Sequence, residues 1–228
     1  MTIAPSVASI PPVRCLAFLL LPLALAACVG SPKKEPPRTA RPAPQAPRPD
    51  DRVIRECKAD LVRLGVKFRS LPDRTFSGGC SAIGTVQLLD ISMPTTNLGA
   101  MTCPVAQKLT VWAREALQPA ARAWLDAQVV KVESYGTYNC RPINNKAGNK
   151  LSEHGRSNAV DVSGFVLSNG RRITVYNDWN GPDEGARNFL RAVHKSACRR
   201  FDVVLGPDAN ALHRDHLHFD MSGSRYCR

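Results

Sequence analysis

The 228-residue sequence lacks the short motifs that mark several large enzyme classes. Neither GxGxxG nor a P-loop occurs, so no nucleotide site is indicated, and the GxSxG motif of serine hydrolases is absent. No cysteines form a CxxC pair, which argues against a cysteine-ligated zinc site. Aromatic residues make up only 6% of the chain and are not interleaved with the basic residues, unlike those of proteins that stack nucleic-acid bases. We therefore expect no nucleic-acid partner.

The sequence also lacks an apolar run that could span a bilayer, which takes about 20 residues. The thirteen residues CLAFLLLPLALAA, at 15–27, follow Arg14 and have the length of the apolar part of a secretory signal. The run ends in LAAC, which resembles the bacterial lipobox. That resemblance implies a lipid on Cys28 and, because Val29 and not aspartate follows, sorting to the outer membrane. We expect a signal peptide at residues 1–27 and a lipid-anchored periplasmic protein; the alternative is an ordinary signal peptide with a chance cysteine.

Acidic residues are few relative to basic ones, 19 against 31, and the net charge is +12. Such a surface suits anionic envelope polymers, although it can also serve solubility alone. Residues 28–52 are rich in proline and poor in large apolar side chains, which is typical of a stiff, extended tether. The remaining residues, 53–228, are long enough for one main folded domain, and we expect it to be monomeric.

Six cysteines remain when Cys15 in the leader and Cys28 at the anchor are set aside. An even number of widely spaced cysteines in an exported chain predicts three disulfides. Six cysteines allow fifteen pairings, and the sequence alone does not choose among them. The pairing favoured here joins Cys57 with Cys80, Cys103 with Cys227, and Cys140 with Cys198.

The pattern of apolar residues predicts helices first and then short strands. Helical periodicity occurs from residue 53 to the glycine at 65, over 103–129 as one helix or two joined at Pro119, and over 184–200. Strands are indicated within 76–92 and at 129–135, 159–167, 171–177, 201–206 and 216–221, with a hairpin turn at SNG, 168–170. Short links between these strands favour an α+β fold, in which a small antiparallel sheet is flanked by helices, over a doubly wound parallel sheet.

Polar side chains collect on one face of the strand at 216–221. Because alternate residues of a strand point to the same side, His216, His218 and Asp220 share a face, and Asp161 projects from one face of the strand at 159–167. Burying such groups without partners is costly, and a divalent metal would solve the problem. Two imidazoles and one carboxylate with a fourth position open are the usual ligands of catalytic zinc. His154, Asp161 and one of the two histidines would supply them.

These residues carry a family resemblance. Ser152, His154 and Asp161 form S-x-H-x6-D, and with the later H-x-H, His216 and His218, they resemble the zinc peptidases that include lysostaphin-type endopeptidases, D-Ala-D-Ala carboxypeptidases and dipeptidases, and the hedgehog domain. More narrowly, residues 57–227, with the segments SYGTYNCRP, LSEHGRSNAVDVSGF, VLGPDAN and HRDHLHFD, are similar to the bacterial extensin-like C-terminal domain family.

The resemblance implies a role for each matching position. His154, Asp161 and His218 would be the zinc ligands, and His216 would assist the water or stabilise the oxyanion. Asp215 competes for the role of general base, because the D-Ala-D-Ala branch has a glutamate at that spacing from its last ligand; the shorter aspartate leaves the base open. Arg141 matches the arginine that polarises the substrate carbonyl, although a cysteine here separates it from the aromatic position.

The expected activity is zinc-dependent hydrolysis of amide bonds in peptidoglycan stem peptides or cross-links. One alternative is a non-catalytic lipoprotein that binds the cell wall and keeps zinc for stability. A two-metal nuclease would require more carboxylates than the sequence offers. Outside this set we expect His213 and His194 to be surface residues, Trp112 and Trp124 to be packing residues, and Asp220 either to orient a histidine or to be an ordinary strand-end acid.

Overall fold

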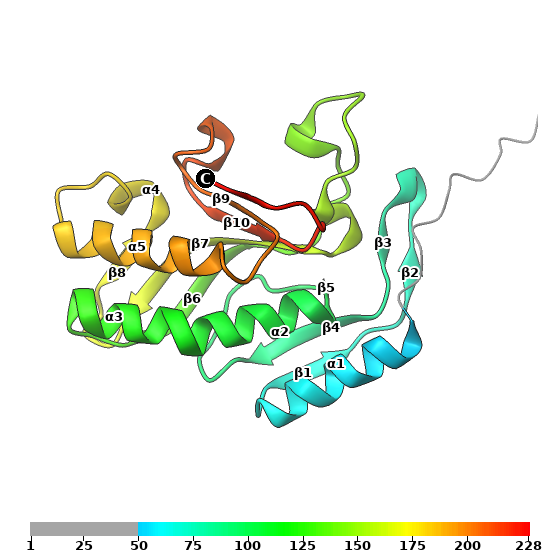
Figure 1. Ribbon diagram of the computed structural model, residues 1–228, viewed down its shortest axis with the longest axis horizontal. Coiled ribbons are helices and arrows are strands. Elements are labelled where there is room, and N and C mark those ends of the chain that lie inside the picture. Colours follow the sequence, from blue (N-terminus) through cyan, green and yellow to red (C-terminus); the bar gives the residue numbers. More distant parts are fainter. Residues whose placement is uncertain (1–49) are drawn as a thin grey trace, which may run out of the picture. The chain divides into compact units, whose positions relative to one another are not determined.

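The computed structural model describes residues 50–228, which belong to the second of the two units into which the chain divides, Arg41–Arg228 (Figure 1). The expected signal peptide at 1–27, the anchor Cys28 and nearly all of the tether at 28–52 lie outside the described residues. Within residues 50–228, no helix has the length and apolarity needed to cross a membrane.

The longer helices form where the periodicity predicts them, whereas the single helical turn at 175–178 lies where a strand was predicted. They are α1 (Asp51–Arg63), α2 (Cys103–Trp112), α3 (Gln118–Leu125), α4 (Val175–Asp178) and α5 (Glu184–Ala197). The Asp50 side chain accepts a hydrogen bond from the Arg52 amide and caps α1. A π-helical turn, Ala113–Leu117, joins α2 to α3, so the helix continues through Pro119 without a break. The wider i→i−5 pattern of such a turn accommodates a residue that has no N–H.

The strands form three sheets. A small sheet has the order β1 (Lys67–Ser70), β4 (Thr85–Asp90), β5 (Met101–Thr102), and β2 (Arg74–Thr75) pairs with β3 (Ser81–Ala82). The main sheet has the order β11 (Tyr226–Cys227), β9 (Val203–Leu205), β10 (Leu217–Asp220), β7 (Ala159–Leu167), β6 (Val129–Gly136), and β8 (Arg172–Thr174) also pairs with β7. All pairs are antiparallel except β11 with β9. The α+β class with small antiparallel sheets is confirmed.

The strands differ from the sequence prediction in three respects. The short strands β1, β2 and β5 lie outside the predicted ranges. The strand expected at 171–177 ends at Thr174, because the next four residues form the single turn α4. The strand at β10 is not the last one, since the exposed two-residue strand β11 follows it. A two-residue strand is too short to produce an alternating pattern, so periodicity could not reveal it.

Large aromatic side chains fill the core between helices and main sheet. Trp112 on α2 is fully buried, lies 5.2 Å from Phe219 on β10 between ring centroids, and donates its indole N–H to the Val193 carbonyl on α5 at 3.0 Å. Helices α3 and α5 lie side by side in Figure 1. Packing was expected for both tryptophans, but Trp124 is 47% exposed, so that expectation is wrong for Trp124. The core anchors β7 and β10 from one face.

The three expected disulfides form, but none of the three pairings favoured from the sequence is correct. The pairs are Cys57–Cys103, Cys80–Cys140 and Cys198–Cys227, with Cα–Cα distances of 6.1, 5.8 and 5.6 Å. A disulfide needs Cα atoms within about 7 Å, and the fold decides which cysteines meet this condition. The first pair joins α1 to α2, and the last joins the end of α5 to β11.

Candidate metal centre

The antiparallel pairing of β7 with β10 brings two of the predicted ligands together. His218 stands directly opposite Asp161 in this register, so both side chains lie on the same face of the sheet. The His218 Nδ1 atom is 2.9 Å from Asp161 Oδ1, and both side chains are buried. Strand register therefore fixes this pair.

The third predicted ligand comes from the turn that precedes β7. His154 lies in a 3₁₀ turn, Glu153–Arg156, whose N-cap is Ser152; the Ser152 hydroxyl accepts a hydrogen bond from the His154 amide. The His154 Nε2 atom lies 3.1 Å from His218 Nδ1 and 3.1 Å from Asp161 Oδ2. The turn at 153–156 and the strands β7 and β10 thus bring two ring nitrogens and a carboxylate together at one point.

Each of the two histidine rings also makes a hydrogen bond on the side that faces away from the cluster. These outer hydrogen bonds decide whether the inner nitrogens, His154 Nε2 and His218 Nδ1, carry a hydrogen or a lone pair. The Thr137 carbonyl can only accept, so His154 donates its Nδ1–H to it, over 3.2 Å. His218 Nε2 lies 3.1 Å from the Asp220 carboxylate, which accepts the second ring N–H. Asp220 therefore orients a histidine. When both rings are neutral, the inner nitrogens are left with lone pairs that face each other and a carboxylate, an arrangement that repels unless a proton or a metal cation lies between them.

Sequence reasoning did not identify the Thr137 carbonyl as the hydrogen-bond partner of His154. Gly136 ends β6 opposite Asp161 with φ of 127°, a conformation in which other residues are strained. The chain leaves the sheet at this glycine and directs the next carbonyl towards His154. A glycine at the end of a predicted strand was the available signal.

The electrostatics of the buried cluster favour positive charge. Burial disfavours the ionised form of Asp161, but hydrogen bonds from His154 and His218 outweigh this and hold the pKa of the carboxyl well below its usual range. Burial also disfavours charged His218, yet the hydrogen bonds to Asp161 and Asp220 raise the pKa of this imidazole to about 9. The cluster therefore holds an anionic carboxylate and attracts a proton or another cation.

The cluster lies in a large open cleft of about 1050 Å³. His216 also lines it, and its Nε2 is 3.6 Å from Asp161 Oδ1. Its other nitrogen, Nδ1, is 2.9 Å from Asp215, which does not line the cleft. Tyr135 packs edge-on against the His216 ring at 5.7 Å, and burial together with the Asp215 carboxylate raises the pKa of this phenol. The geometry thus places His216 towards the cluster and Asp215 behind it.

His213 is a cleft residue that sequence reasoning placed on the surface. It is half-buried and lines the cleft, and its ring centroid is 5.1 Å from that of His216. Its Nδ1 is 2.9 Å from the Asn210 amide oxygen, which accepts the ring N–H. Burial and the nearby His216 and His218 lower the pKa of His213 to about 4. A 3₁₀ turn, Ala211–His213, folds the residue back over the cleft, and such a turn leaves no periodic pattern in the sequence.

A comparison with known protein families identifies the folded region. The model of the family described as extensin-like protein C-terminus matches residues 55–228. The chain belongs to this family. Searches of curated proteins and of solved structures found no match. The match agrees with the resemblance noted at residues 57–227 and covers every described residue of the cleft.

Arg141 lies in the cleft of this extensin-like domain, as predicted. It is half-buried and immediately follows Cys140, which the disulfide to Cys80 ties to the β2–β3 region. The Arg141 carbonyl accepts the Ser152 amide at 3.1 Å, so the arginine segment pairs with the residues that lead into the His154 turn. The structure thus brings Arg141 into the same cleft as His154, Asp161, His216 and His218.

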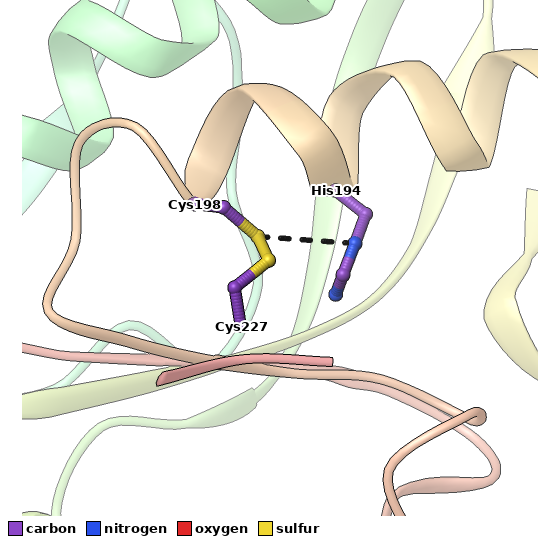
Figure 2. Close-up of side chains that lie close together, drawn as sticks. All are labelled: His194, Cys198 and Cys227. Carbon is purple, nitrogen blue, oxygen red and sulfur yellow. Dashed lines mark hydrogen bonds between the residues drawn. A yellow bond between two sulfur atoms is a disulfide. The ribbon is translucent and has the colours of Figure 1, made fainter. Parts of the chain in front are cut away.

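A second group of potential ligand atoms in the extensin-like domain is occupied by a disulfide. His194, Cys198 and Cys227 lie close together (Figure 2), with 4.0 Å between His194 Nδ1 and the Cys198 sulfur. Both cysteines are bonded to each other, so neither offers a thiolate. His194, expected on the surface, is half-buried against Trp179, and burial lowers the pKa of its imidazole. Among the described residues, the His154 cluster is the better candidate for a metal site.

Proposed function

We propose that the protein is a zinc-dependent peptidase that hydrolyses amide bonds of peptidoglycan stem peptides or cross-links in the bacterial envelope. One observation carries the proposal. His154, Asp161 and His218 face one another in an open cleft, with 2.9 to 3.1 Å between the two inner ring nitrogens and from each nitrogen to one of the two Asp161 oxygens, and both ring N–H groups already have acceptors outside.

The ligand set fits zinc. Four-coordinate zinc with bonds of about 2.0 to 2.1 Å holds neighbouring ligand atoms about 3.3 Å apart. The two ring nitrogens are 3.1 Å apart, and each lies 2.9 or 3.1 Å from one of the two Asp161 oxygens. Two imidazole nitrogens and one carboxylate oxygen are a set found in catalytic zinc sites, which keep a fourth position open. Zinc bound here would supply a Lewis acid for the scissile carbonyl and lower the pKa of bound water to about 7.

The chain's own residues would handle the proton. Asp215 fixes the His216 ring through Nδ1, so that Nε2 is directed towards the cluster and the cleft. In this position His216 would accept a proton from the attacking water and deliver it to the leaving amine. Asp215, the competing candidate for general base, would then orient His216, because it contacts His216 and does not line the cleft.

Arg141 would bind the substrate. A guanidinium carries a permanent charge and several N–H donors, and Arg141 lines the cleft that contains the cluster. It would donate hydrogen bonds to the substrate carbonyl as negative charge develops, or to a substrate carboxylate. The predicted export, the lipid on Cys28 and the net charge of +12 support an envelope polymer as the substrate.

Digestion of purified muropeptides by the full chain tests the proposal. The purified protein should contain about one zinc per chain by elemental analysis, and chelator should abolish cleavage. His154→Ala should lower cleavage at least ~100-fold, because it removes a ligand as well as an outer hydrogen bond. His194→Ala is the matched control, since His194 lies outside the cleft, and it should cleave normally. Cleavage that survives both chelator and His154→Ala would defeat the proposal.

A further inference from the structure

A second cavity, of about 240 Å³, lies next to the cleft. Tyr138 lines this cavity whereas the next residue, Asn139, lines the cleft, so the two share one chain segment as a wall. Tyr138 and Phe76 form an aromatic pair there, with ring centroids 5.3 Å apart, and they are 36% and 41% exposed. We call this cavity the aromatic pocket; its lining includes Arg74, Phe76, Ala82, Thr85, Ala100 and Tyr138.

The aromatic pocket offers hydrogen-bond donors on an apolar surface. The Thr85 hydroxyl is fully buried and has no hydrogen-bond partner among the described residues. Arg74 is exposed and adds guanidinium donors, which cannot accept. Thr85 is fully buried, so an occupant of the pocket would meet the apolar and aromatic side chains of the lining and not this hydroxyl. A fitting occupant is therefore apolar.

The described chain begins beside this pocket. The Asp50 carbonyl accepts the Ile54 amide at 3.1 Å, in the first turn of α1. The Ile54 side chain packs against Gly84, where an added Cβ would lie 2.6 Å from Ile54 Cδ1. Gly84 stands between Ala82 and Thr85, both of which line the pocket. Asp50, where the described chain begins, is therefore one helical turn from a residue that packs beside the pocket wall.

We propose that residues 41–49, RPAPQAPRP, dock in the aromatic pocket. Four of these nine residues are prolines, whose apolar rings suit a pocket lined by Phe76 and Tyr138. Proline-rich segments bind aromatic-lined grooves because their extended conformation loses little entropy on binding. At about 3.1 Å per residue the segment can extend roughly 28 Å, well beyond the turn that separates Asp50 from the pocket.

Fluorine NMR of the full chain tests this docking independently of any activity. The four tyrosines, Tyr135, Tyr138, Tyr176 and Tyr226, are labelled as 3-fluorotyrosine, and Tyr138→Phe assigns the signal of the pocket. Replacing Pro42, Pro44, Pro47 and Pro49 with serine should shift the Tyr138 signal and leave the other three in place. The matched control replaces Pro32, Pro36 and Pro37 and should shift none. When Phe76→Ala is also present, the Tyr138 signal should be the same with the native segment and with the serine-substituted segment.

Three outcomes would overturn the proposal. A Tyr138 signal that is identical with and without the four prolines would mean that residues 41–49 do not occupy the pocket. A Tyr138 signal that changes with protein concentration, equally in the native and the proline-substituted protein, would assign the pocket to a second copy of the protein. A signal that ignores the prolines and moves on addition of purified muropeptides would assign it to an external ligand.

Discussion

The two sides of the metal cluster are held by different means. Asp161 and His218 stand opposite each other in the β7–β10 register, over a core that includes Trp112 and Phe219. His154 and Arg141 come from segments outside the sheet that are held by short contacts and by the Cys80–Cys140 disulfide. One side is positioned by regular structure, whereas the other is positioned by local hydrogen bonds and a covalent link.

This difference indicates which side of the cleft is held more rigidly. A register shift of one residue would turn His218 to the opposite face, so the sheet side is fixed within the cooperative fold. The other side can move without unfolding the sheet, and it carries the cation expected to meet the substrate. We therefore expect changes on the sheet side to alter metal binding and stability together, and changes on the other side to alter metal or substrate binding more selectively.

The largest effect should come from the charge of the sheet-side pair in metal-free protein. The pKa of His218 is raised to about 9, against an unfolded value of about 6.5, so the stabilisation from its charged form is complete below pH 6.5 and is lost as pH rises through 9. This shift corresponds to roughly 3 kcal/mol. Urea unfolding of the full chain in chelator, at pH 6 and pH 9.5, measures it.

A matched variant separates this effect from general alkaline destabilisation. His218→Gln removes the titrating ring, and its free energy of unfolding should change little between the two pH values. Bound zinc replaces the proton, so the loaded protein should also lose the dependence, and zinc affinity should rise with pH over the same range. If the metal-free native protein were as stable at pH 9.5 as at pH 6, the proposed positive charge on His218 would be wrong.

The regular side of the cleft was the predictable side. Alternation placed His218 and Asp220 on one face, and the apolar run at 159–167 placed Asp161 in a buried strand, because strand period is a local property of the sequence. The cross-strand register itself was not predictable, since it depends on which strands pair. The resemblance supplied His154, whose 3₁₀ turn produces no periodicity.

Features that depend on distant segments escaped sequence reasoning. The three disulfides were counted correctly and paired wrongly, because pairing follows from contacts such as α1 against α2. His213 was placed on the surface, because nothing local reveals that Ala211–His213 folds over the cleft. The Thr137 carbonyl was missed, since Gly136 marks where the strand ends but not which side chain the next carbonyl meets.

An intermediate effect should follow when the outer partner of His218 is removed. Asp220→Asn keeps the shape but replaces the charged acceptor at 3.1 Å from His218 Nε2 with an amide. Outer partners of metal-binding histidines typically contribute 10- to 100-fold in affinity, so zinc should bind roughly 10 to 100 times more weakly. Competition with a chromophoric chelator measures this. Asp202→Asn, a change of the same type at a residue that does not line the cleft, should leave zinc affinity unchanged; equal losses in both variants would contradict the orienting role of Asp220.

The smallest effect, a several-fold change in KM, should come from the Cys80–Cys140 disulfide on the other side of the cleft. One variant replaces Cys80 and Cys140 by serine, and the control replaces Cys57 and Cys103. The two disulfides close loops of 60 and 46 residues, so the loop-closure entropy predicts a similar loss of folding stability in each variant, about 4 kcal/mol. Only the first pair lies beside Arg141. Under conditions where both variants remain folded by circular dichroism, we expect KM for muropeptides to rise several-fold in the first and to stay unchanged in the second. Because the two changes destabilise the fold about equally, a rise of KM in both would trace it to stability alone and would remove the distinction between the two sides of the cleft.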